Sequence, residues 1–94
     1  MTLDDIVSYP KVKNVKILLE RSARNSAIAN KMHSGQIVTE ETEGKSWLFY
    51  IPEVPKEVII PWILSQGGEA IPLEPQEIVD EVKLRTAAIL ERLA

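Results

Sequence analysis

The segment 46–51 (Ser-Trp-Leu-Phe-Tyr-Ile) places five large apolar residues in succession, and a proline follows directly. A strand with one face in water would alternate between apolar and polar residues. An unbroken apolar run of this length, rich in aromatic residues, is instead typical of a β-strand covered on both faces. We therefore predict that 46–51 is a central strand of a sheet. The rest of the chain must then supply strands on both sides of it and elements that cover its faces.

Three further segments have the pattern of strands. Residues 12–19 alternate in hydrophobicity, and residues 36–41 are rich in β-branched side chains. A turn at 41–45 joins 36–41 to the central strand, so these two strands should form an antiparallel hairpin. Residues 69–73 supply a fourth strand.

Helical patterns fill the intervals between these strands. A short helix over 23–32 follows Ser22, a plausible N-cap. A second helix opens with Pro55 at its first position and ends at Gly67-Gly68. Its apolar stripe is Val58, Ile59, Trp62 and Ile63. A third helix runs from Glu74-Pro75 to the C-terminus, and its stripe is Val79, Val82, Thr86, Ile89, Leu90 and Leu93.

The resulting order is β-α-β-β-α-β followed by a helix, which predicts the α+β class. The first six elements match the ferredoxin-like βαββαβ sandwich, here with an added C-terminal helix. Right-handed crossovers would place the two early helices on one face of a four-stranded antiparallel sheet and leave the other face open.

The composition narrows the possible chemistry. With 94 residues the chain is one domain, and no apolar run approaches the roughly 20 residues of a membrane span. It has no cysteine and one histidine, His33, so we expect neither a metal site nor a cofactor. No catalytic triad, paired carboxylates or glycine-rich phosphate loop is recognisable, and we expect a non-enzymatic, cytoplasmic protein.

The charge is unevenly distributed along the chain. The net charge is −3, whereas a nucleic-acid-binding protein usually carries a basic surplus. Between residues 11 and 31, however, only Glu20 opposes six basic residues: Lys11, Lys13, Lys16, Arg21, Arg24 and Lys31. A solvated face explains such a series, and so does a patch that contacts phosphate or the acidic half of a partner chain.

Four segments between Val15 and Leu93 resemble the WCX domain, the C-terminal extension of bacterial WYL-domain transcription regulators. They are Ile-Leu-Leu-Glu at 17–20, Lys-Met-His-Ser-Gly-Gln at 31–36, Pro-Trp-Ile-Leu-Ser-Gln-Gly at 61–67 and Glu-Ala-Ile-Pro-Leu-Glu-Pro at 69–75. The chain departs from the family pattern at Met32, often Trp in the family, at Ser34-Gly35 in place of Pro-Ser, and at Pro61, usually Arg. The resemblance implies a WCX-like ferredoxin-fold domain over 12–94, with 1–11 as a linker or N-terminal extension.

The resemblance also implies a role in transcription regulation. It predicts a non-catalytic module that contributes to dimerisation, with DNA contacted only through other domains of a longer protein, and that contributes to effector sensing. Two alternatives stay open. One is a stand-alone ACT-like domain that binds a small molecule or nucleotide. The other is an accessory nucleic-acid-binding domain that uses the basic surface.

Two sets of residues are candidates for these roles. A ligand pocket would use the polar loop after the first helix and the basic residues before it: His33, Ser34, Gln36, Arg21 and Arg24. The ordinary interpretation is a loop histidine bound to backbone and a set of solvated cations. A homodimer interface would use apolar positions left outside the core: Leu18, Trp47 and Tyr50. Trp47 and Tyr50 lie on opposite faces of one strand, so one of them must point away from the helices.

Overall fold

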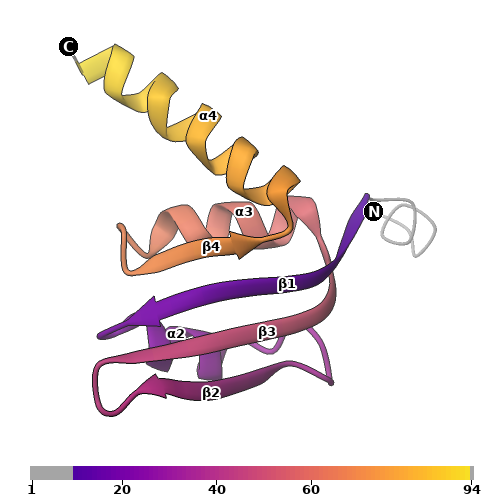
Figure 1. Cartoon of the computed structure of the whole chain (residues 1–94). Helices are drawn as coiled ribbons and strands as arrows, with labels where there is room; N and C mark the ends of the chain where they lie inside the picture. Colours follow the sequence, from indigo (N-terminus) through magenta and orange to yellow (C-terminus); the bar gives the residue numbers. More distant parts are fainter. Residues whose placement is uncertain (1–9, 94) are drawn as a thin grey trace.

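Four strands and three helices make up residues 10–93, the part of the chain that the computed structural model describes. In chain order they are β1 (Lys11–Glu20), α2 (Ala23–Ala29), β2 (Ile37–Thr42), β3 (Ser46–Pro55), α3 (Lys56–Ser65), β4 (Ala70–Glu74) and α4 (Gln76–Leu93). The strands form one antiparallel sheet in the order β2-β3-β1-β4 (Figure 1). The predicted α+β class with an added C-terminal helix is therefore confirmed, and β3 lies inside the sheet as expected.

The two long strands β1 and β3 pair along their whole length, and one irregularity interrupts them. The ladder joins Lys13 to Glu53 and Val15 to Ile51, and it leaves out Asn14 and Pro52 between these pairs. Pro52 has no N–H to donate to a ladder. Asn14 has a positive φ of 54°, and its Oδ1 accepts a hydrogen bond of 2.9 Å from the Tyr50 hydroxyl. The strand thus accommodates the proline by a local distortion of its neighbour.

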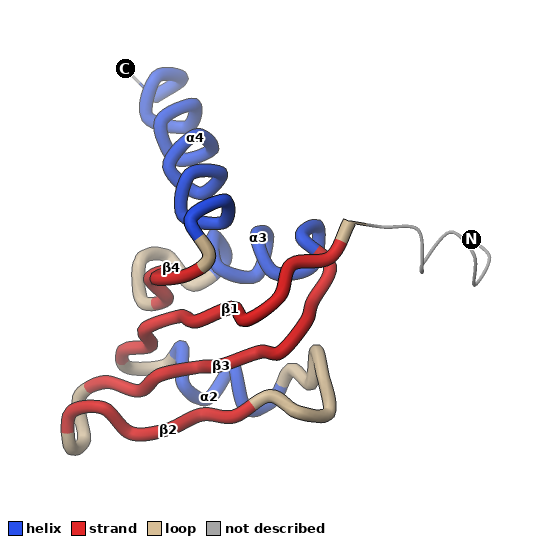
Figure 2. The backbone as a smooth tube through the Cα atoms, turned by 45° about the vertical axis from the view of Figure 1, so that its right-hand side comes forward, coloured by secondary structure: helices blue, strands red, loops and turns tan. Residues whose placement is uncertain are grey.

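Both α2 and α3 lie on the same face of the sheet (Figures 1 and 2). The two helices are joined by the Trp62 indole N–H, which donates to Ser26 Oγ at 3.1 Å, and Trp62 packs edge-on against Phe49 of β3. The core between the layers consists of Val12, Val15, Ile17, Leu19, Ala23, Ala27, Phe49, Ile51, Val54, Ile59, Ile60, Trp62, Ile63, Ala70 and Ile78.

The predicted end of the central strand was wrong. We expected 52–55 to leave the sheet and Pro55 to be the first helical residue. In fact β3 continues to Pro55, which has an extended backbone, and the helix begins at Lys56. The extension is stable because Val54 pairs with Val12 of β1 and both side chains are buried.

The helices also differ in detail from the sequence predictions. α2 ends at Ala29, not at residue 32, because Asn30 turns to an extended conformation and its side-chain amide donates to the carbonyl oxygen of Ser26. Ser22 occupies the N-cap position but makes no capping hydrogen bond, because its backbone is helical (φ −70°, ψ −16°) where a capping residue is normally extended. Its hydroxyl donates to Glu69. In α3 the buried stripe includes Ile60 in place of the predicted Val58, which is exposed.

The last helix, α4, leaves the body of the domain at the β4 edge and projects away from it (Figures 1 and 2). Ile78 in its first turn is buried, and Val82 packs against the core. Beyond these residues the predicted stripe is exposed at Ile89, Leu90 and Leu93. None of the helices described is long and apolar enough to cross a membrane.

Candidate functional site: the loop after α2 and the open sheet face

The Gln36 side chain holds the loop between α2 and β2 in place. Its Oε1 accepts hydrogen bonds from the backbone N–H groups of Met32, at 2.7 Å, and His33, at 3.1 Å. Its Nε2 donates to the carbonyl oxygens of Ala27, at 3.3 Å, and Asn30, at 3.1 Å. A helix leaves its last carbonyl groups without partners, and Gln36 satisfies two groups at this end. The main role of the Gln36 amide is therefore to stabilise the loop through these four hydrogen bonds.

His33 is also engaged with the backbone. Its Nδ1 accepts a hydrogen bond of 2.8 Å from the N–H of Gly35. Gly35 is closely surrounded, because a Cβ atom there would lie 3.1 Å from Pro52 Cγ and 3.2 Å from His33 Nδ1. A side chain at position 35 would therefore require Pro52 or the His33 ring to shift by a few tenths of an ångström. Ser34 is exposed at the tip of the loop.

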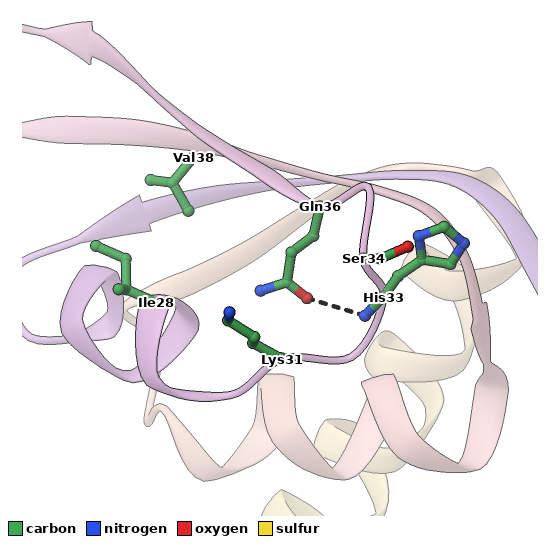
Figure 3. A pocket seen from close by; sticks show the side chains of 6 residues that line it. All are labelled: Ile28, Lys31, His33, Ser34, Gln36 and Val38. Atoms are coloured by element: carbon green, nitrogen blue, oxygen red, sulfur yellow. Dashed lines mark hydrogen bonds between the residues drawn. The ribbon is translucent and has the colours of Figure 1, made fainter.

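A surface hollow of about 510 Å³ opens beside this loop (Figure 3). We call it the loop hollow; it is lined by Ile28, Lys31, His33, Ser34, Gln36 and Val38. Lys31 and Gln36 approach each other across it, whereas the His33 ring is turned away from them. Since Gln36 is occupied by backbone groups, the ammonium of Lys31 and the hydroxyl of Ser34 are the groups best placed to contact a ligand.

The two arginines predicted to share this site lie elsewhere. Arg24 stands in the first turn of α2, and its guanidinium lies over the Trp47 ring at 5.4 Å from the centroid, a cation–π geometry. Arg21 is exposed in the turn before α2 and has a positive φ of 49°. The loop is at the opposite end of α2. The structure therefore brings His33, Ser34 and Gln36 together and separates them from Arg21 and Arg24.

The basic series between residues 11 and 31 does not form one uninterrupted patch. Lys11 pairs with Glu53 at 3.7 Å, and Lys16 pairs with Glu74 at 3.4 Å. Lys31 lies far along the chain from both, in the loop after α2. Partial neutralisation and dispersal of these charges weaken the interpretation of this series as a phosphate-binding surface.

Among residues 10–93, no helix lies over the face of the sheet opposite α2 and α3 (Figure 1). The register places apolar side chains next to one another across all four strands of this face. One row contains Thr39, Leu48, Leu18 and Ile71, and the next contains Ile37, Tyr50 and Lys16. Ile37 and Ile71 are exposed, and Leu18, Leu48 and Tyr50 are half-buried. We call these five apolar residues the open face.

The predicted interface residues divide between the two faces of the sheet. Leu18 and Tyr50 belong to the open face, whereas Trp47 pairs with the buried Leu19 and packs against the core on the helix side. Leu48 and Ile71 were not singled out from the sequence. Leu48 could have been found, because in a strand it shares a face with Tyr50 two residues later.

The described residues contain no preformed metal-binding site. Over 10–93, no group of three or more His, Asp or Glu side chains is arranged to hold an ion. In the same range, every buried side-chain nitrogen or oxygen atom has a hydrogen-bond partner.

Comparison with protein-family models gives a match. A model of the WCX domain family matches residues 11–90, from the first residue of β1 into the last turns of α4. No curated protein and no solved structure matches the chain. The open face and the loop hollow both lie inside the matched range.

Proposed function

The chain belongs to the WCX domain family, a regulatory domain associated with WYL-type transcription regulators, and from that premise we propose that it is a non-catalytic self-association module. The open face is the surface that meets a second copy. DNA is contacted through other domains of a longer protein.

The outward positions of the two central strands carry this proposal. An antiparallel sheet with one face in water normally presents polar side chains on that face. Here Leu18, Leu48 and Tyr50 occupy those positions, and Ile37 and Ile71 extend the apolar surface to both edges. Contiguous apolar surface of this kind is typical of protein–protein interfaces.

Charges beside the open face do not oppose a second copy stacked on it. Lys16 and Glu74 form an ion pair within the chain beside the apolar rows, so two copies of this face do not repel each other strongly. The edge strand β2, in contrast, carries the exposed residues Glu40 and Glu41. Like charges oppose edge-to-edge pairing of two β2 strands. We therefore infer a face-to-face arrangement with two-fold symmetry.

We also infer that the sandwich is ferredoxin-like. The order β-α-β-β-α-β supports this, as do the central positions of β1 and β3 with β2 and β4 at the edges.

Sedimentation equilibrium at micromolar concentration tests the proposal. We expect a mass about twice the 10.6 kDa of one chain. Leu18→Lys places a charge at the centre of the open face and should give a folded monomer, with folding checked by circular dichroism. Ile28→Lys is the matched control, because Ile28 is an exposed apolar residue on the helix side, and this variant should remain a dimer.

The oligomeric states of the wild type and the variants decide the proposal. A monomeric wild-type chain would overturn the proposal. If Leu18→Lys does not fold, Ile71→Lys at the exposed β4 edge replaces it. A dimer that tolerates the folded open-face variant and is broken by Leu90→Lys would place the contact on α4 and refute the assignment to the open face.

Effector sensing at the loop hollow is a second candidate function. Its volume of about 510 Å³ lies within the usual 300–1,000 Å³ of small-molecule sites. A thermal-shift screen with amino acids and nucleotides tests it, since a ligand at 100 times its Kd adds about 2.7 kcal/mol of stability. A screen without any shift would contradict it.

A further inference from the structure

A second hollow of about 520 Å³ lies between the loop after α2 and the first turns of α3. We call it the helix hollow; it is lined by Asn30, Lys31, Met32, Pro55, Val58 and Trp62. It shares only Lys31 with the loop hollow. Its volume is also in the range of small-molecule sites.

Four of the six lining side chains are apolar, and one of them is held rigidly. The Trp62 indole N–H donates to Ser26 Oγ at 3.1 Å, and its ring packs edge-on against Phe49 with centroids 5.6 Å apart. The polar edge of the indole is thus satisfied within the protein. Val58 is 44% exposed, although its neighbour Ile59 is fully buried. Trp62 is only 9% exposed, so it forms the floor of the hollow, and the accessible apolar surface comes from Val58 and the half-buried Met32.

The two polar residues at the rim, Asn30 and Lys31, differ in whether they have partners within the protein. The amide nitrogen of Asn30 donates to the carbonyl oxygen of Ser26 at 2.7 Å, and the Asn30 carbonyl accepts from Gln36. Lys31 lines both hollows, and its ammonium points toward Gln36 in the loop hollow (Figure 3), so it reaches a ligand in the helix hollow by rotation of its exposed side chain. It makes no ion pair within residues 10–93, where the paired cations are Lys11, Lys16 and Arg85. The helix hollow therefore combines an apolar wall with one unpaired positive charge at its rim, which it shares with the loop hollow.

We propose that the helix hollow binds a small carboxylate with an aromatic or branched aliphatic body. The body packs on Trp62, Met32 and Val58, and the carboxylate contacts the Lys31 ammonium. A single lysine is a point charge without the bidentate fork of arginine, so it matches a monoanion better than a phosphate. This inference is independent of self-association, because the helix hollow and the open face lie on opposite sides of the sheet.

The 94-residue chain can be tested by nuclear magnetic resonance with methyl-¹³C-labelled methionine. The chain has two methionines, so the spectrum contains few signals, and Met32→Leu identifies the signal from the hollow. We expect 2-naphthoate to shift the Met32 methyl signal saturably through the ring current of the naphthalene. For a ligand of this size, the Kd should be on the order of 1 mM.

Two comparisons isolate the role of the charge. Lys31→Gln should weaken 2-naphthoate binding about two- to fivefold, as expected for an exposed ion pair, and should leave binding of the neutral 2-naphthalenemethanol unchanged. Lys45→Gln, in the exposed β2–β3 turn, is the matched control and should bind 2-naphthoate as the wild type does. Thermal unfolding checks that each variant is folded.

The proposal is overturned if 2-naphthoate leaves the Met32 methyl signal unmoved. It is also overturned if Lys31→Gln binds 2-naphthoate as tightly as the wild type, because the site then has no preference for an anion. Neither result affects the sedimentation test of self-association.

Discussion

At the scale of single residues, the loop after α2 shows how one set of donors and acceptors can serve two purposes. His33 and Gln36 have the polarity that a ligand site needs, and the sequence led to that interpretation. In the structure, Gln36 forms hydrogen bonds with carbonyl and N–H groups at the end of a helix, and His33 Nδ1 accepts a hydrogen bond from the Gly35 N–H within the loop. Sequence reasoning could not separate these roles, because the same atoms bind ligand or backbone equally well.

Replacing Gln36 should destabilise the domain strongly for a residue near the surface. Gln36→Ala removes four hydrogen bonds and leaves backbone groups of the loop unpaired, and we expect a loss of about 2 kcal/mol in the free energy of unfolding. Gln76→Ala, which removes one exposed hydrogen bond to Asp80, should cost less than about 0.5 kcal/mol. Urea unfolding measures both variants. Equal losses in the free energy of unfolding would contradict the stabilising role of Gln36.

The role of His33 predicts which substitutions the loop tolerates. The Oδ1 atom of asparagine can take the place of the imidazole Nδ1 and accept the N–H of Gly35, as in an Asx turn. His33→Asn should therefore retain stability, whereas His33→Ala should lose about 1 kcal/mol. The check is a pair of denaturation curves measured on the two variants. An asparagine variant no more stable than the alanine variant would show that the hydrogen bond is unimportant.

At the scale of elements, the order of strands and helices could be predicted from sequence, and several boundaries could not. Alternation and apolar runs identified each element because they depend on local periodicity. Pro52 suggested the end of a strand. Yet β3 continues past it, because the distortion at Asn14 accommodates the missing donor and Val12 and Val54 pair beyond. Such compensation comes from a residue 38 positions away in sequence, and local patterns do not contain it.

The two halves of α4 should respond differently to truncation of apolar side chains. Val82→Ala removes two CH₂ equivalents, worth about 0.8 kcal/mol each when fully buried. Val82 packs against the core but is only partly buried, so we expect a cost of about 1 kcal/mol. Leu90 is 67% exposed, and Leu90→Ala should change the stability of the single chain by less than about 0.5 kcal/mol. Urea unfolding at concentrations below the dimer Kd measures both. A larger loss for Leu90→Ala would show that the distal half of α4 packs against the body.

At the scale of the whole molecule, the arrangement is a sheet with α2 and α3 on one face and an apolar surface on the other. The sequence predicted a sheet with one open face and also a central strand covered on both faces. Within residues 10–93 helices cover only one face of β3, and the sequence did not predict which aromatic residue each face receives. The register answers this: Trp47 faces the helices under Arg24, and Tyr50 lies on the open face beside Leu18 and Leu48. A single residue of slippage would exchange the two faces, so pairing partners, and not composition, determine the exposed surface.

An isotope-filtered nuclear Overhauser experiment on a mixture of ¹³C-labelled and unlabelled chains tests the role of the open face most directly, since it detects only contacts between copies. We predict intermolecular signals from the methyl groups of Leu18, Leu48 and Ile71. The absence of any intermolecular signal at micromolar-to-millimolar concentration, or signals confined to Ile89, Leu90 and Leu93 of α4, would contradict self-association through the sheet.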